Sequence, residues 1–208
     1  MRSSLSPALL AGALLMLGGC SRAASAEMGD PAIGQPAPAF QGTDSDGKAQ
    51  SLSAYKGKWV VLEWLNHGCP FVRKHYDSKN MQTLQKEMTD KGVVWLSIIS
   101  SAEGKQGFST PEKANADRTS NGASPTAIVL DAKGDIGRLY GARTTPHLFI
   151  IDPNGMLVYK GGIDDHASTD PDDIAGSTNY VRQALTEGMA GKPITVSASK
   201  PYGCSVKY

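Results

Sequence analysis

Two apolar stretches rich in β-branched residues dominate the pattern of hydrophobic and polar positions. They cover 59–65 and 93–99, and each has the length and the flanking turn residues of a buried strand. Between them, apolar residues recur near helical spacing over 71–90, and Lys91-Gly92 ends the predicted helix. A strand, a helix and a strand in this order predict a right-handed βαβ unit with two parallel strands.

The rest of the pattern is more broken but completes the same layered architecture. We expect strands at 126–130, 148–151 and 157–161, helices at 111–119, 134–140 and 178–188 (with Thr178 as N-cap), a hairpin turn at 44–47, a polar insertion at 162–177 and a short strand or extended arm at 194–196. A length of 208 residues favours one domain. The sequence therefore predicts an α/β fold, with a mixed central sheet flanked by helices and an N-terminal hairpin extension. The formal net charge of +1 gives no electrostatic reason to expect a nucleic-acid partner.

Residues 1–26 are typical of a targeting segment that stays outside the fold. A positively charged start precedes an apolar run at 9–17, which is too short to span a bilayer. Residues 17–20 resemble a bacterial lipobox, in which Cys20 is lipidated and becomes the first mature residue, whereas 24–26 offer a signal-peptidase site. We favour the lipobox because it follows the apolar run directly. Either site predicts an exported, periplasmic protein, and the lipobox adds an anchor to a bacterial membrane.

The candidate chemistry centres on Cys69. It follows the first buried strand and precedes Pro70, which suits the first helical position because that residue needs no N–H. Unpaired N–H groups and the positive end of the helix dipole meet at this point. With Arg73 and Lys74 nearby, this field favours the thiolate, the reactive form of cysteine. The alternative is a small buried hydrophobic residue, so the redox interpretation expects a sulfur that solvent can reach.

The segment around Cys69 resembles the active-site segment of the thioredoxin-like superfamily, specifically its redoxin branch of AhpC/TSA and peroxiredoxin-like proteins. The sequence Cys-Pro-Phe-Val-Arg-Lys at 69–74 matches their register, and 33–40 resembles their entry segment. The resemblance implies a thioredoxin-like domain at 33–198, followed by a tail at 199–208 that carries Cys204. It also implies a thiol-dependent oxidoreductase with no cofactor, acting on a thiol or disulfide protein partner or on a peroxide.

One position departs from the family pattern. Val72 stands where the second cysteine of a Cys-x-x-Cys pair would be, so a local cycle between two cysteines is impossible. A second thiol must come from elsewhere, and Cys204 is the candidate because Cys20 belongs to the targeting segment. Whether Cys69 and Cys204 form a disulfide stays open, since the bond requires Cα atoms within about 7 Å of each other.

Thr145-Pro146 stands directly before the predicted strand at 148–151, where a proline is unusual. Thioredoxin-like proteins carry a Thr-Pro or Val-Pro here, with a cis peptide bond that faces the active-site cysteine. The resemblance therefore implies a cis bond at Pro146, close to Cys69. A cis bond leaves the backbone of Thr145 able to pair with an extended thiol substrate.

The resemblance leaves peroxide and disulfide substrates open. Peroxiredoxins carry threonine at the position of Asn66 and arginine at the position of Pro146, and both groups stabilise the peroxide oxygens. Their absence argues against an efficient peroxidase, although Arg73 or Arg143 could substitute.

Two further interpretations belong to other classes. His67, His75 and His147 fall near the expected site and could bind copper or zinc together with Cys69. A histidine beside a reactive cysteine more often tunes its pKa, so we expect His67 and His147 to act on the thiol and expect no metal. The other interpretation is a redox-inactive interaction module that keeps the fold.

The acidic insertion at 162–177 could suggest a calcium site. It lacks the glycine and the terminal glutamate of an EF-hand loop, so we expect a solvated loop instead.

Overall fold

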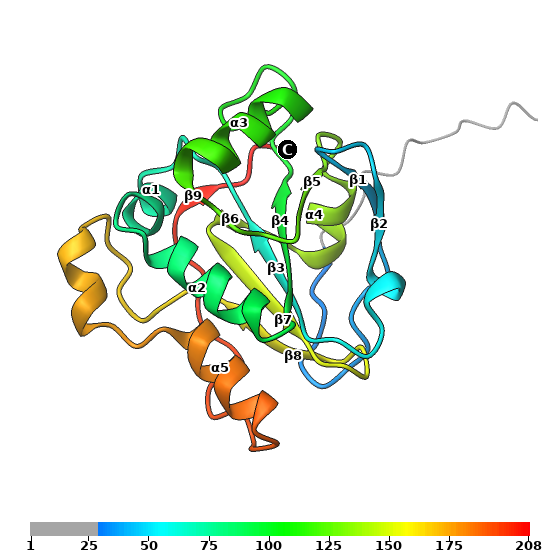
Figure 1. The fold of residues 1–208 in the computed structure, drawn as a ribbon, viewed down its shortest axis with the longest axis vertical. Helices are drawn as coiled ribbons and strands as arrows, with labels where there is room; N and C mark the ends of the chain where they lie inside the picture. Colours follow the sequence, from blue (N-terminus) through cyan, green and yellow to red (C-terminus); the bar gives the residue numbers. More distant parts are fainter. Residues whose placement is uncertain (1–28) are drawn as a thin grey trace, which may run out of the picture.

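In a computed structural model of the protein, residues 29–208 are described. They form one mixed sheet of seven strands in the order β2-β1-β5-β4-β3-β7-β8, with helices on both faces (Figure 1). The strands are β1 (Gln41–Asp44), β2 (Ala49–Ser51), β3 (Val60–Trp64), β4 (Val94–Ile99), β5 (Ala127–Leu130), β7 (His147–Ile151) and β8 (Leu157–Gly161). A second sheet pairs β6 (Thr144–Thr145) with β9 (Cys204–Ser205).

The helices follow the predicted order along the chain. They are η1 (Leu52–Tyr55), α1 (Pro70–Asp77), α2 (Asn80–Asp90), α3 (Pro111–Asn121), α4 (Asp135–Tyr140), η2 (Pro171–Gly176) and α5 (Tyr180–Met189), of which η1 and η2 are 3₁₀ helices. The expected hairpin extension is β1 with β2. The predicted targeting segment 1–26, with Cys20, lies outside the described residues. Within 29–208, no helix has the length and apolar character needed to cross a membrane.

The centre of the sheet confirms the predicted βαβ unit. Strand β3 runs parallel to β4, and β4 runs parallel to β5, whereas β7 lies antiparallel on the other side of β3. Every position of β3, β4 and β7 is buried, because both faces of these strands are covered. Alternate residues of β3 pack into two cores, with Val61 on the face of α1, α2 and α5 and Leu62 on the face of α4.

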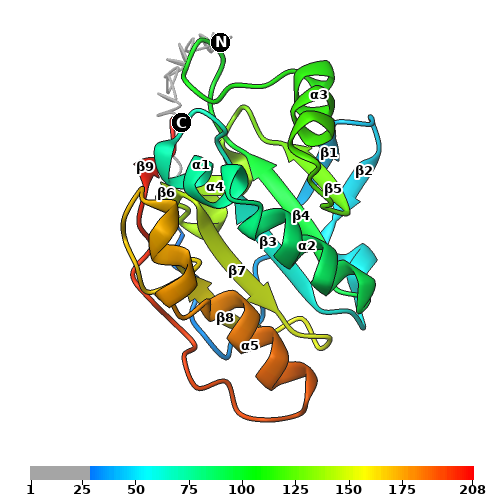
Figure 2. The same cartoon turned by 60° about the vertical axis from the view of Figure 1, so that its left-hand side comes forward.

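The single helix predicted over 71–90 is wrong, since the structure has two helices there (Figure 2). The Ser78 hydroxyl donates to the carbonyl of Lys74 over 2.6 Å, which competes with the backbone bonds of the helix. Lys79 then takes a left-handed conformation with φ 64°. The side chain of Gln82 also donates to the Tyr76 carbonyl at this break, over 2.8 Å. The break turns α1 away from α2.

Two smaller expectations concern the start of α5 and the residues after it. Helix α5 begins at Tyr180, and its N-cap is Asn179, whose side-chain oxygen accepts the N–H of Arg182 over 2.9 Å. Thr178 is therefore not the cap. Residues 194–196 form an extended arm rather than a strand, and the arm continues along β8 as far as Ser199. This arm carries the chain back to the end of the sheet where Cys69 lies.

Candidate active site

Cys69 lies where β3 turns into α1. The turn is built by Asn66, whose side-chain oxygen accepts the Gly68 N–H over 2.8 Å and whose carbonyl accepts the Cys69 N–H over 2.9 Å. Cys69 is the N-cap of α1, and Pro70 is the first helical residue. The predicted placement of the sulfur at the N-terminus of a helix is confirmed.

The C-terminal tail brings the second cysteine to the first. Strand β9 pairs antiparallel with β6, and this register places Cys204 opposite Thr145. The backbone N–H of Cys204 donates to Cys69 Sγ over 3.4 Å, and Cys69 Sγ donates to the Thr145 carbonyl over 3.1 Å. Both cysteines are free thiols. The fold therefore joins three of the predicted site residues, although they come from three distant segments.

The bond between Thr145 and Pro146 is cis, as the family resemblance implies. Thr145 is buried, and its carbonyl faces the sulfur of Cys69. The edge that an extended substrate would use is occupied by the tail itself, because Thr144 and Thr145 already pair with β9.

The two thiols differ in acidity. Burial raises the pKa of Cys69, but hydrogen bonds from the Cys204 thiol and from the N–H groups of Val72 and Cys204 outweigh it, so the net pKa lies below the usual value. Burial, together with the hydrogen bond and the charge of Cys69, raises the pKa of Cys204 to about 11. Cys69 is therefore the sulfur that becomes a thiolate first, and Cys204 keeps its proton.

The expectation that solvent reaches Cys69 is wrong for this structure, in which Cys69 is 0% exposed. Residues of the tail, Tyr202 and Cys204, pack against the core cluster that contains Cys69. Cys204 is only partly buried. The sulfur of Cys69 is thus covered in part by the segment that carries Cys204, and an external molecule could reach this sulfur only if the tail moved.

The cations expected to favour the thiolate act elsewhere. Arg73 is exposed and pairs with Asp77 over 3.2 Å. Lys74 is buried and lies 3.8 Å from Asp164. Neither cation is among the groups that lower the pKa of Cys69. The sequence pattern did not reveal these partners, because Asp164, which faces Lys74, lies far away in the chain.

The three histidines point in different directions. His67 stacks edge-on against Tyr76, with ring centroids 5.0 Å apart. His75 contacts the hydroxyl of Tyr202 over 3.2 Å. His147 accepts the Arg143 N–H, and burial lowers its pKa to about 3.

His67 and His147 are expected to bind substrate or to tune the pKa of the thiol. Neither is among the groups that set the pKa of Cys69, so the structure does not support the tuning role, and a role in substrate binding stays a prediction. Within residues 29–208, no three histidine, cysteine or acidic side chains gather as metal ligands. The copper or zinc site considered above therefore has no ligand set in this part of the chain.

Two residues of the site were not found from the sequence. Gly203 has φ 133°, and a Cβ on it would lie 2.1 Å from the Thr145 carbonyl oxygen, so only glycine lets the tail approach this closely. Tyr202 anchors the tail to α1. The sequence feature that could have indicated these two residues is the glycine directly before the tail cysteine, in Tyr-Gly-Cys at 202–204.

Comparison with known proteins shows the family and the fold to which the chain is similar. The model of the AhpC/TSA family matches residues 33–160. A thiol-disulfide oxidoreductase ResA of Geobacillus thermodenitrificans is 26% identical over 133 residues, which are 61% of this chain and 67% of the relative.

Two solved structures are similar over most of the described chain. An uncharacterized conserved protein of Geobacillus kaustophilus superposes with a TM-score of 0.73 and 26% identity, over 88% of this chain and 95% of that one. A hypothetical protein of Sinorhizobium meliloti superposes with a TM-score of 0.72 over 88% and 97%, and at 21% identity it shows the fold alone. The fold is also that of a thioredoxin domain of a thiol-disulfide oxidoreductase from Bacteroides vulgatus, with a TM-score of 0.50 over 70% of this chain and 96% of that one, so the expected thioredoxin-like α/β fold is confirmed.

Proposed function

The chain belongs to the AhpC/TSA family, and we propose that it is a thiol-disulfide oxidoreductase in which Cys69 is the nucleophile and Cys204 is the resolving thiol. The observation that carries the proposal is the contact of Cys204 with Cys69 Sγ, which supplies the second thiol that Val72 cannot. The difference in acidity assigns the roles, because the thiolate is the attacking species and the lower pKa belongs to Cys69.

The reaction follows from this assignment. The Cys69 thiolate attacks one sulfur of a substrate disulfide, that S–S bond breaks, and the released substrate sulfur takes up a proton. Cys204 then loses its proton and attacks Cys69 Sγ in the mixed disulfide, which frees the second substrate thiol. The substrate gains two electrons and two protons, and the Cys69–Cys204 pair loses them. An external dithiol reductant returns the pair to the reduced state.

The substrate class is a disulfide in an extended polypeptide. The backbone of Thr144 and Thr145 is an edge that pairs with a strand, and the tail shows that a cysteine on such a strand reaches Cys69. A peroxide is the less supported substrate, because no cation is among the groups that act on the Cys69 sulfur. Of the two arginines considered above, Arg73 pairs with Asp77 at the surface, and Arg143 is not among the groups that act on the pKa of Cys69, so neither supports a peroxidase.

The location of the protein and the extent of its functional parts are also proposals. We place it outside the cytoplasm, because residues 1–26 have the pattern of an export signal and a dithiol pair suits an oxidising compartment. Within the mature chain, 33–198 would be the redoxin domain, and 199–208 would be a functional tail that carries the resolving thiol. Lipidation of Cys20 would keep the protein at a membrane.

The test uses the full chain with Cys20→Ser, so that two cysteines remain. Reduction of insulin by dithiothreitol should be accelerated by this protein and should fall to the uncatalysed rate with Cys69→Ser. Cys204→Ser should accumulate a mixed disulfide on Cys69, visible by mass spectrometry of peptides without reduction.

Each alternative gives a different result. Two free thiols after treatment with oxidised glutathione would reject Cys204 as the resolving thiol. Rapid consumption of hydrogen peroxide without insulin reduction would favour a peroxidase. Inactivity in both assays would leave a redox-inactive module.

A further inference from the structure

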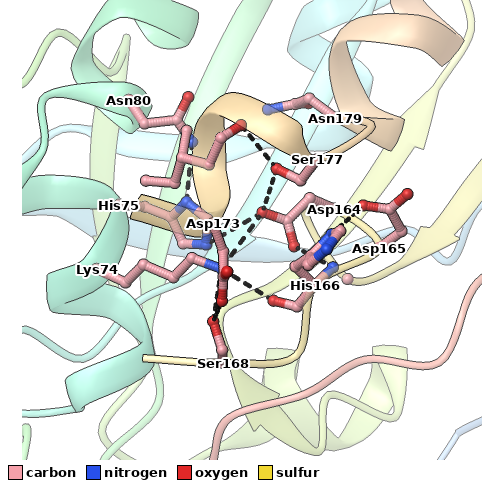
Figure 3. A network of polar contacts seen from close by, with 12 residues as sticks. Lys74, His75, Asn80, Asp164, Asp165, His166, Ser168, Asp173, Ser177 and Asn179 are labelled. Carbon is pink, nitrogen blue, oxygen red and sulfur yellow. Dashed lines mark hydrogen bonds and ion pairs between the residues drawn. The ribbon is translucent and has the colours of Figure 1, made fainter. Parts of the chain in front are cut away.

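A buried cluster of charged side chains joins the loop after β8 to helix α1 (Figure 3). Lys74 and His75 of α1 each lie 3.8 Å from Asp164 Oδ2, and the side chains of Lys74 and Asp164 are 0% and 1% exposed. Lys74 also donates to the His166 carbonyl over 2.9 Å. The prediction of a solvated loop at 162–177 is therefore wrong for its first part, because this part closes over α1 and buries its carboxylate against a cation.

The C-terminal tail enters the same cluster through Tyr202. Its hydroxyl donates to Asp164 Oδ1 and contacts His75 Nε2 over 3.2 Å. Its ring packs edge-on against Phe71, with centroids 5.9 Å apart. Tyr202 stands two residues before Cys204, and α1 is the helix whose N-cap is Cys69. The tail that carries Cys204 and the helix that begins at Cys69 are thus joined by a second set of contacts, through the hydroxyl of Tyr202 and the carboxylate of Asp164.

We propose that Asp164 and Tyr202 form a latch that positions Cys204 on Cys69 and controls access to the nucleophile. The inference rests on the proposed function and adds its regulation. While the latch is closed, Cys204 contacts Cys69 and external reagents are kept out. When it opens, Cys204 and the segment before it leave Thr145, and a substrate strand can pair with Thr145 in their place.

The chemistry of the cluster suits a latch because one hydrogen bond in it is assisted by charge. The carboxylate of Asp164 has no exposure through which water could replace the Tyr202 hydroxyl. Downstream of Cys204 the tail is held separately, since the Val206 N–H donates to the Arg143 carbonyl over 3.0 Å and the Tyr208 hydroxyl donates to the Ala142 carbonyl over 2.7 Å. Loss of the latch would therefore free the segment before Cys204 and leave the end of the tail attached.

The test measures how fast iodoacetamide alkylates Cys69 in the fully reduced full-length protein, read from the peptide that contains Cys69. Tyr202→Phe removes only the hydroxyl and should raise the rate about tenfold or more, the factor expected for a hydrogen bond to a charged group. Asp164→Asn should act in the same direction. The matched control is Asp165→Asn, because the neighbouring carboxylate bonds to His166 and Thr178 and not to the tail.

A second readout separates positioning from general loosening. Since hydrogen bonds from Cys204 lower the pKa of Cys69, opening the latch should move the midpoint of the alkylation profile to higher pH. Urea unfolding should show that Tyr202→Phe lowers the folding equilibrium constant by no more than the factor by which it raises the alkylation rate. If Tyr202→Phe and Asp165→Asn both alkylate at the rate of the parent protein, the latch is rejected. Should Asp164→Asn fail to fold, Tyr202→Phe alone decides.

The alkylation experiment involves no disulfide. The proposed function fails if no Cys69–Cys204 bond forms after treatment with oxidised glutathione. This outcome is measured separately from the alkylation rate, so the two failures can be told apart.

Discussion

The backbone N–H of Cys204 points at the sulfur of Cys69 from 3.4 Å, although 135 positions separate the two residues in the chain. The contact depends on β9 reaching the backbone next to the cis proline, where Cys204 lies opposite Thr145. Val72 stands where a Cys-x-x-Cys pair has its second cysteine, and the C-terminal tail places another cysteine at the sulfur of Cys69 instead.

Removal of the Cys204 side chain should make Cys69 less acidic. Although burial raises the pKa of Cys69, a hydrogen bond from the Cys204 thiol is the largest of the effects that lower it. Cys204→Ala removes this bond and keeps the backbone N–H. We expect the pKa of Cys69 to rise in this variant, as measured by thiolate absorbance against pH in the Cys20→Ser background. An unchanged or lower pKa would contradict the assignment.

Gly203→Ala should displace the tail. The backbone has φ 133°, and the new Cβ would lie 2.1 Å from the Thr145 carbonyl oxygen, which is backbone and cannot turn aside. We expect faster alkylation of Cys69 and slower closure of the mixed disulfide by Cys204, both followed by mass spectrometry. Gly176→Ala is the control because nothing lies within 4 Å of its added Cβ. Equal behaviour of the two variants would argue against a close contact of the tail.

Adjacent cations on α1 should differ greatly in their effect on stability. Lys74→Met leaves the buried carboxylate of Asp164 without its lysine and should lower the free energy of unfolding by about 3 kcal/mol or more. Arg73→Met removes an exposed pair with Asp77 and should cost less than about 1 kcal/mol. Urea unfolding at neutral pH measures both.

The double variant Lys74→Met with Asp164→Leu should recover much of the lost stability, because no unpaired charge remains buried. Additive losses in the double variant would show that the pair itself contributes little.

Acid should destabilise the protein through His147. Burial is the main cause that lowers its pKa to about 3, and the charges of Arg143 and Lys160 act in the same direction. An unfolded chain binds this proton near pH 6.5, so stability is lost as pH falls from about 6.5 toward 3. We expect His147 to account for about 2 kcal/mol of the unfolding free energy lost between pH 7 and pH 5.

His147→Asn keeps an acceptor for the Arg143 N–H and should reduce this loss, as measured by urea unfolding at the two pH values. His166→Asn is the control, since His166 is exposed and should not remove the loss. A loss of the same size in the parent and in His147→Asn would assign the acid sensitivity to other groups, of which His75, with a pKa lowered to about 4 by burial, is the first candidate.

The sequence by itself determined the local features of this protein. Runs of apolar residues placed β3 and β4, and the order of Cys69 and Pro70 placed the sulfur at the start of a helix. These features depend on neighbours in the chain, so periodicity and single residue types reveal them. The cis bond before β7 was implied by the family resemblance of Thr145-Pro146. The helix break at Lys79 was missed because it depends on one hydroxyl competing for a backbone carbonyl.

Only the tertiary structure decided what surrounds the sulfur. The direction of Lys74, the burial of Asp164 and the return of Cys204 to Cys69 all join segments far apart in the chain. Such contacts depend on the path of a loop and of a tail that have no periodic pattern of their own. The sequence therefore identified Cys69 and named Cys204 as its candidate partner, whereas the contact between the two, the cover over the sulfur and the groups that set its pKa were decided by packing between distant segments.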